Sequence, residues 1–231
     1  MSKLTDGVAE GTNPAFRLFG KHRDHPRAVE LATKAHALLV RYATEVVSAH
    51  RLCPFLRGVD SGLGAVGVVL DVEPDVEVAR LAIEALDEPI VHLVFPLFAA
   101  GSSPFERFGN RLAETLRRER SASPTPKETL VHASFHPEMV GGRENAYRLI
   151  GLLRQSPDPF VQFIPHGLQQ GGTVLAGEDA PVRSHAEDRF ERLIRDGEAG
   201  ASEVLSLIAE LKREREQAYG DLARLVAASG A

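Results

Sequence analysis

Residues 63–98 read LGAVGVVLDVEPDVEVARLAIEALDEPIVHLVFPLF, and they contain two apolar runs separated by a helical pattern. The runs LGAVGVVLD (63–71) and PIVHLVFPLF (89–98) are rich in valine and almost continuously apolar, which is typical of strands buried on both faces. Between them, Pro74 and Asp75 precede VEVARLAIEAL, which has helical periodicity. A strand, a helix and a second strand in this order predict part of an α/β sheet.

The same alternation continues on both sides of this stretch. Before it, a helix is predicted from Pro26 to about residue 52, with its apolar positions at helical spacing. After it, the sequence predicts a helix beginning at residues 102–104 (SSP), a strand at 127–135, a helix at 143–155 and a shorter strand at 159–165. The order α-β-α-β-α-β-α-β predicts an α/β layered fold with a mostly parallel or mixed sheet.

The two ends of the chain differ from this pattern. Residues 1–25 show no period and predict a flexible N-terminal tail, followed by an α/β domain at 26–180 and a C-terminal helical extension at 181–231. The last predicted helix carries one apolar stripe, formed by Ile208, Leu211, Ala218, Leu222 and Leu225 and interrupted by Arg215. Such a stripe favours a helix packed on the sheet, and the alternative is a helix that forms a homodimer.

Composition excludes several classes of protein. The 231 residues are 43% hydrophobic and 26% charged, as in a globular domain, and the net charge of −5 argues against binding to nucleic acid. No apolar run approaches the roughly 18–20 residues that span a bilayer, and the first 25 residues do not resemble a signal peptide. Cys53 is the single cysteine, so an internal disulfide is excluded and a cytoplasmic location is predicted, without a nucleic-acid or membrane partner.

The strand LVHASFHP (130–137) offers the first candidate for chemistry. Its alternation places His132, Ser134 and His136 on one face. His136 stands at the carboxyl end of the strand, where ligands collect in open α/β sheets, so we expect it to be functional. His132 stands further back, and we expect it to be a hydrogen-bonded structural histidine.

Three further stretches supply candidate partners. The loop EMVGG (138–142) before a predicted helix, with Arg143, is suited to an anionic group. Cys53 stands three residues after His50 at a predicted helix end, where a thiolate could be a nucleophile or metal ligand and where core packing is an equal alternative. His166 follows a proline in a predicted loop, and its default is a solvent-exposed side chain.

Several motifs occur together in a familiar order: Leu-Cys-Pro-Phe at 52–55, Ser-Phe-His-Pro at 134–137, Asn145, and Arg-x-Ser-Pro-x-Pro at 154–159. Over roughly residues 30–168 the chain resembles a bacterial family, number fourteen-fifteen in the series of domains of unknown function. The resemblance implies that Cys53, Asn145 and Arg154 are neighbours of His136, and it implies no reaction. The chain departs from the family at Arg154 and Gln155, where the family usually has Asn-Arg directly before Ser-Pro, and at Gln162 and Pro165, where it tends to have His and then Arg.

We therefore expect an enzyme that acts on a small anionic molecule. His136 would be its acid/base or metal ligand, Cys53 its thiolate, and the substrate would be bound by Arg143, Asn145, Arg154 and Ser156. In one alternative, a transition metal or haem is held by His136, Cys53 and His166 or His132, as in a redox protein. In the other, the chain is a non-catalytic ligand-binding or assembly module.

Overall fold

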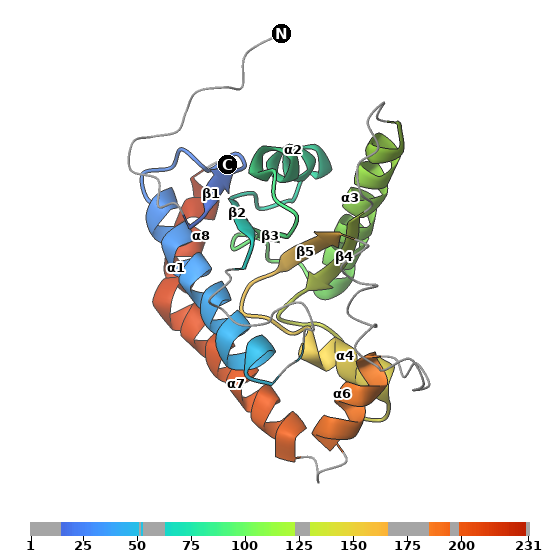
Figure 1. Ribbon diagram of the computed structural model, residues 1–231. Helices are drawn as coiled ribbons and strands as arrows, with labels where there is room; N and C mark the ends of the chain where they lie inside the picture. The colour runs from blue at the N-terminus through green and yellow to red at the C-terminus, as the bar shows by residue number, and fades with distance from the viewer. Residues whose placement is uncertain are drawn as a thin grey trace.

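The computed structural model describes residues 15–50, 52, 63–122, 130–165, 185–194 and 199–229. Within them, five strands form one mixed sheet in the order β1-β2-β3-β5-β4 (Figure 1). Strands β1, β2 and β3 are parallel, and β5 runs antiparallel to both of its neighbours. The strands are β1 Arg17–Phe19, β2 Ala65–Val69, β3 Val91–Val94, β4 Leu130–Phe135 and β5 Phe160–Pro165. The predicted α/β fold with a mixed sheet is confirmed.

Helices cover both faces of this sheet. One face packs against α2 (Val76–Leu86) and α3 (Ser102–Ala122), through a core that includes Phe95, Phe105 and Phe163. The other face packs against the remaining helices through a second core. This core contains residues of β2 and β3 and of helices near the start and the end of the chain. These helices are α1 Ala28–Arg41, the π-helical turn η1 Tyr42–Ser48, α4 Ala146–Leu153, α6 His185–Ile194, α7 Ala199–Arg215, the π-helical turn η3 Glu216–Gly220 and α8 Asp221–Ala228.

Local sequence explains where the second helix begins and ends. Asp75 is extended, and its carboxylate accepts hydrogen bonds from the backbone N–H groups of Glu77 and Val78, so it caps α2 as the Pro-Asp pair predicted. Asp87 ends the helix in the left-handed conformation, with φ 47°. This short helix therefore returns the chain directly to β3.

The prediction of a tail through residue 25 is wrong for β1. Arg17–Phe19 pairs with Gly67–Val69 of β2, and three residues are too few to show a period in the sequence. Gly20 turns the chain with φ 95°, and a Cβ there would lie 2.9 Å from the backbone of Leu70. The strand therefore depends on β2 and on this glycine rather than on its own composition.

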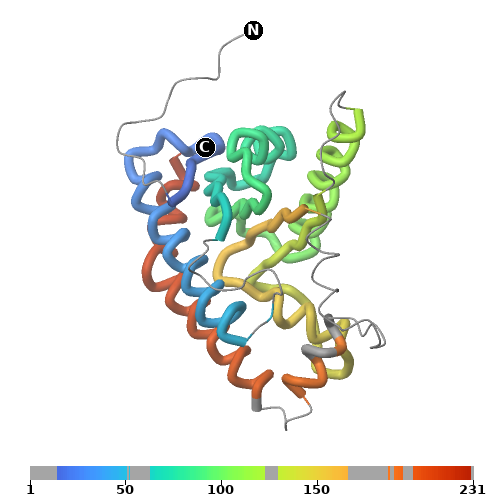
Figure 2. Tube along the Cα trace, in the orientation of Figure 1, coloured from blue at the N-terminus to red at the C-terminus, as the bar shows by residue number. Residues whose placement is uncertain are grey.

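The C-terminal helices lie antiparallel to α1 and η1 and share their core, so the boundary predicted at 180–181 does not separate two cores (Figure 2). Of the predicted stripe, Ile208, Leu211 and Leu222 are buried, whereas Ala218 and Leu225 are exposed. Tyr219 and Val226 are buried instead. Tyr219 lies in the π-helical turn η3, which has more residues per turn than an α-helix, while Leu222 after it keeps its predicted buried position.

Candidate functional site

The segment 153–159, with sequence LRQSPDP, joins α4 to β5 at the carboxyl ends of β3 and β4. Its backbone is fixed at three points. The Tyr42 hydroxyl donates to the Leu153 carbonyl at 3.0 Å. The backbone N–H of His136 donates to the Arg154 carbonyl at 3.1 Å, and that of Phe95 donates to the Pro159 carbonyl at 2.9 Å. Contacts from η1, β3 and β4 therefore determine the course of this segment.

The middle of the segment is held by the last helices. Asp158, 5% exposed, accepts from Arg215 Nε at 2.9 Å and from the Tyr219 hydroxyl. Arg215 also donates through Nη2 to the carbonyl of Pro96 at 2.7 Å, and the Lys212 ammonium donates to the carbonyl of Pro137 at 2.6 Å. Burial by itself would lower the pKa of Arg215, but the charge and hydrogen bond of Asp158 raise it above its ordinary value.

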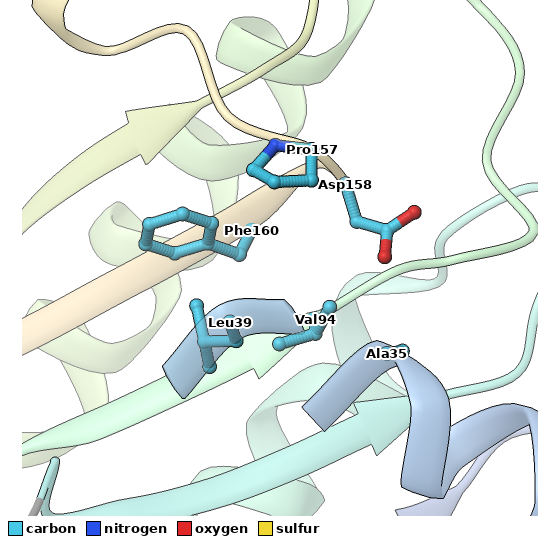
Figure 3. A pocket seen from close by; sticks show the side chains of 6 residues that line it. All are labelled: Ala35, Leu39, Val94, Pro157, Asp158 and Phe160. Carbon is cyan, nitrogen blue, oxygen red and sulfur yellow. The ribbon is translucent and has the colours of Figure 1, made fainter. Parts of the chain in front are cut away.

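A small cavity lies beside this cluster (Figure 3). It is lined by Ala35, Leu39, Val94, Pro157, Asp158 and Phe160. Figure 3 shows the carboxylate of Asp158 turned away from the ring of Phe160. The cavity volume is about 10 Å³, which is room for about one water molecule and not for a substrate. The bonds of Asp158 to Arg215 and Tyr219 therefore hold the last helices to the segment 153–159, and the cavity is a small gap in the packing beside them.

His136 lies at the carboxyl end of β4, as predicted, and only 3% of it is exposed. Its Nδ1 accepts from the backbone N–H of Glu138 at 3.0 Å, and its Nε2 donates to the carbonyl of Ala100 at 2.9 Å. The ring contacts Phe98 and Phe105, and burial lowers its pKa. Both ring nitrogens of the neutral imidazole are thus bonded to backbone, and proton transfer through His136 would first require one of these bonds to break.

The structure places the predicted substrate-binding residues at two ends of α4. Asn145 caps its start, where the side-chain oxygen accepts from the backbone N–H of Arg148 at 3.0 Å. Arg143 donates to the hydroxyl of Ser202 at 3.3 Å. Arg154 lies at the other end, and the eight residues between them span about 12 Å of helix. Ser156 is fully buried, and its hydroxyl donates to the carbonyl of Asp158 at 2.6 Å. The segment 153–159 therefore brings the backbone of Arg154 to that of His136, whereas Asn145 lies at the other end of α4.

A group of four polar residues, here called the edge cluster, lies beside the outer strand β4: Glu106, Asn110, His132 and Arg154. Glu106 and Asn110 are one turn apart on α3, and the Asn110 oxygen accepts from His132 Nε2 at 3.1 Å. The helix approaches β4 closely because Gly109 has no side chain, and a Cβ there would lie 2.4 Å from the hydroxyl of Ser134. His132 has the hydrogen bond expected of a structural histidine, and no motif in the sequence marks its neighbours Glu106 and Asn110.

Arg154 differs from its neighbours because its half-buried guanidinium makes no hydrogen bond or ion pair within the described ranges. Burial lowers its pKa, and the charge of Glu106 opposes that shift. The pKa of His132 is lowered first by burial and second by the charge of Arg154, and its ring is stacked on Phe163. The charges of Glu106 and Arg154 therefore act within the edge cluster, and the guanidinium of Arg154 is partly open to solvent.

Two buried polar atoms elsewhere also have no hydrogen-bond partner among the described residues: Asp71 Oδ2 and His92 Nδ1. Asp71 directly follows β2, and its other oxygen accepts from the backbone N–H of Lys21 at 2.7 Å. His92 lies in β3 opposite Gln162, whose amide nitrogen is 3.0 Å from His92 Nε2, and burial lowers its pKa to about 4. These groups lie in the core of the sheet and not in the edge cluster.

The metal hypothesis rests largely on residues that the structure does not describe. Cys53 and His166 lie outside the described ranges. Inside those ranges, no group of three or more His, Cys, Asp or Glu side chains could hold a metal ion. No helix there is long and apolar enough to cross a membrane. Binding of a transition metal or haem stays a prediction.

The chain matches no protein-family model, no curated protein and no solved structure. The resemblance in the Phe-His-Pro and Ser-Pro-x-Pro motifs therefore stays a prediction, and the function has to be argued from the residues themselves.

Proposed function

We propose that this protein binds a small anionic molecule at the edge cluster and that His132 accepts a proton from it. The observation that carries the proposal is the guanidinium of Arg154, which is half-buried and has no hydrogen-bond partner in the described part of the chain. Burial removes part of the water around this cation, so an anion that bonds to it would replace the lost hydration. A carboxylate or phosphate would satisfy it with two parallel hydrogen bonds.

The surroundings of Arg154 support this reading. Its carbonyl accepts from His136, and the next side chain, Gln155, donates to the carbonyl of Met139 at 3.0 Å. Ser156 and Asp158 are bonded within the protein as described above. The segment thus holds Arg154 in place while its guanidinium stays available, which is the preorganisation that a binding residue requires.

His132 is better suited to proton transfer than His136. Its Nε2 carries the proton that Asn110 accepts, so Nδ1 is an acceptor on a partly exposed neutral ring. The lowered pKa keeps the ring neutral at pH 7, as a base must be. An anion held by Arg154 would place its adjacent atoms beside this ring, and removal of a proton is the reaction that the pair supports. The competing function is a non-catalytic binding module with the same anion site.

The remaining proposals concern location and partners. A single cysteine and a net charge of −5 support a cytoplasmic protein that acts on a small molecule rather than on nucleic acid. Cell fractionation would test the location.

Titration calorimetry with inorganic phosphate and with acetate tests the anion site. We expect Arg154→Gln to weaken binding at least about tenfold, the loss expected from a charge-assisted pair. Arg148→Gln is the matched control, because Arg148 is exposed on the same helix and faces Glu144 at 3.7 Å. Equal affinities in the wild type and Arg154→Gln would overturn the proposal. His132→Gln should keep binding and lose turnover if the protein is an enzyme.

A further inference from the structure

We infer that the anion bound at the edge cluster is the C-terminus of an extended peptide, which pairs with β4 as an added strand and places its carboxylate on Arg154. This inference rests on the anion site proposed above and names the class of ligand that fills it. Addition of a strand to a sheet edge is a recurring mode of peptide recognition, in which main-chain hydrogen bonds supply the affinity.

Strand β4 is one edge of the sheet, and the register shows which of its backbone groups point outward (Figure 1). Phe95 and Pro159 continue the pairing of β3 with β5 by one residue, and the N–H of Phe95 donates to the Pro159 carbonyl. Because backbone groups alternate in direction along a strand, those of Gln162 point the other way, toward its partner Ala133 in β4. The positions of β4 whose backbone groups point outward are therefore Leu130, His132 and Ser134.

These outward backbone groups are unpaired within the described part of the chain. No hydrogen bond joins any of them to a described residue, and the bond of His132 to Asn110 is made by its ring. Of the 6 residues of β4 only Ser134 is buried, whereas every residue of β3 is buried. The sequence LVHASF contains no lysine or proline, which commonly keep an edge strand from pairing. The outer edge of β4 is therefore suited to a further strand.

Arg154 closes one end of this edge. The next outward group along the chain is the N–H of His136, and it already donates to the Arg154 carbonyl at 3.1 Å. An added strand therefore ends beside Arg154. The positions from 130 to 134 can pair with about four or five residues of an extended chain.

The charge at the closed end determines the direction of the added strand. A strand antiparallel to β4 would place its N-terminal ammonium here, where the guanidinium of Arg154 would repel it. A parallel strand places its C-terminal carboxylate here, and a carboxylate can accept two hydrogen bonds from a guanidinium. Other arginines without a described carboxylate partner, such as Arg107 and Arg111, are exposed on α3 and do not close a strand edge. The charge of Arg154 also lowers the pKa of His132, as expected if the guanidinium lies near this edge.

The test compares acetate with the peptide acetyl-Thr-Val-Thr-Val, prepared as the free acid and as the carboxamide, by titration calorimetry. We expect the free acid to bind at least about tenfold more tightly than acetate, because main-chain hydrogen bonds add to the carboxylate contact. The carboxamide should bind at least about tenfold more weakly than the acid. Arg154→Gln should remove the difference between acid and carboxamide, whereas Arg148→Gln should keep it.

Strand pairing has a matched control of its own, since neighbouring amides of an extended peptide point to opposite sides. One N-methyl group is placed on either of two adjacent central amides of the free acid. One methylated peptide should lose at least about tenfold in affinity, and the other should bind as the parent does.

Three results would each overturn this inference: a free acid that binds no more tightly than acetate, an acid and carboxamide of equal affinity, and equal affinities of the two methylated peptides. In each case, binding of acetate that depends on Arg154 would leave the anion site standing. Binding of neither acetate nor peptide would remove both the inference and the proposed function.

Discussion

Asp158 joins three elements, and its removal should be among the most costly single changes in the protein. Asp158→Ala removes the buried carboxylate of Arg215, whose side chain is 19% exposed and keeps only the more exposed Glu216 at 3.2 Å, and it leaves the Tyr219 hydroxyl without its acceptor. Removing one partner of a buried pair costs about 3–5 kcal/mol. Because small domains are stable by about 5–15 kcal/mol, this loss is a large fraction of the free energy of unfolding.

The magnitude can be assigned to the pair by a double-mutant cycle. Asp158→Ala, Arg215→Met and the double variant are unfolded in urea, with far-UV circular dichroism as the probe. We expect the double variant to be less destabilised than the sum of the single variants by about 2 kcal/mol or more, since neither charge is then left alone. The exposed pair Arg224 and Asp221, 2.7 Å apart, is the control and should show coupling of about 0–1 kcal/mol.

A coupling of less than about 1 kcal/mol for Asp158 and Arg215 would refute this reasoning. It would mean that this pair adds little to the apolar packing of Ile208, Leu211 and Val226, which holds the C-terminal helices against the rest of the protein.

Other predictions follow from buried groups. Burial lowers the pKa of His92 to about 4, so the unfolded chain binds a proton there at higher pH than the folded protein does. Stability should therefore fall as pH falls from about 6.5 to 4. His92→Gln should flatten that part of a profile of urea stability against pH. Gly109→Ala should destabilise by about 1–3 kcal/mol through its contact with the Ser134 hydroxyl, and Ser134→Ala should rescue part of the loss in thermal unfolding. Burial and Asp158 raise the pKa of Tyr219, so stability should fall above about pH 10, and Tyr219→Phe should reduce that fall.

Much of the fold could be predicted from sequence because each long element carries its own period and its own ends. The strand, helix and strand at 63–98 and the Asp75 cap are examples of such local signals. β1 could not be predicted, since its three residues owe their conformation to pairing with β2. The buried face of the last helix was predicted in part: Ile208, Leu211 and Leu222 are buried, whereas Tyr219 and Val226 are buried in place of Ala218 and Leu225.

The candidate site was predicted in part. Alternation predicted that His132 and His136 share one face of β4, and in the structure His132 contacts Asn110 of α3 and the His136 ring contacts Phe105 of α3. The resemblance implied that Arg154 is a neighbour of His136, and the backbones of these two residues are hydrogen-bonded. Their chemical environments could not be predicted. They depend on which backbone groups reach each ring from loops and helices distant in sequence, as Ala100 reaches His136. Glu106 carries no motif at all, and only the packing of α3 on β4 brings it near Arg154.

The most direct test of the central claim is to observe the guanidinium of Arg154 itself. NMR of the arginine Nε–Hε groups, assigned with Arg154→Gln and Arg148→Gln, follows each side chain as acetate or glycine is added. The account predicts that the Arg154 resonance shifts and saturates while that of Arg148 stays in place, because a bound carboxylate accepts from one and not the other. An Arg154 resonance that does not move, or that moves no more than that of Arg148, would contradict the account.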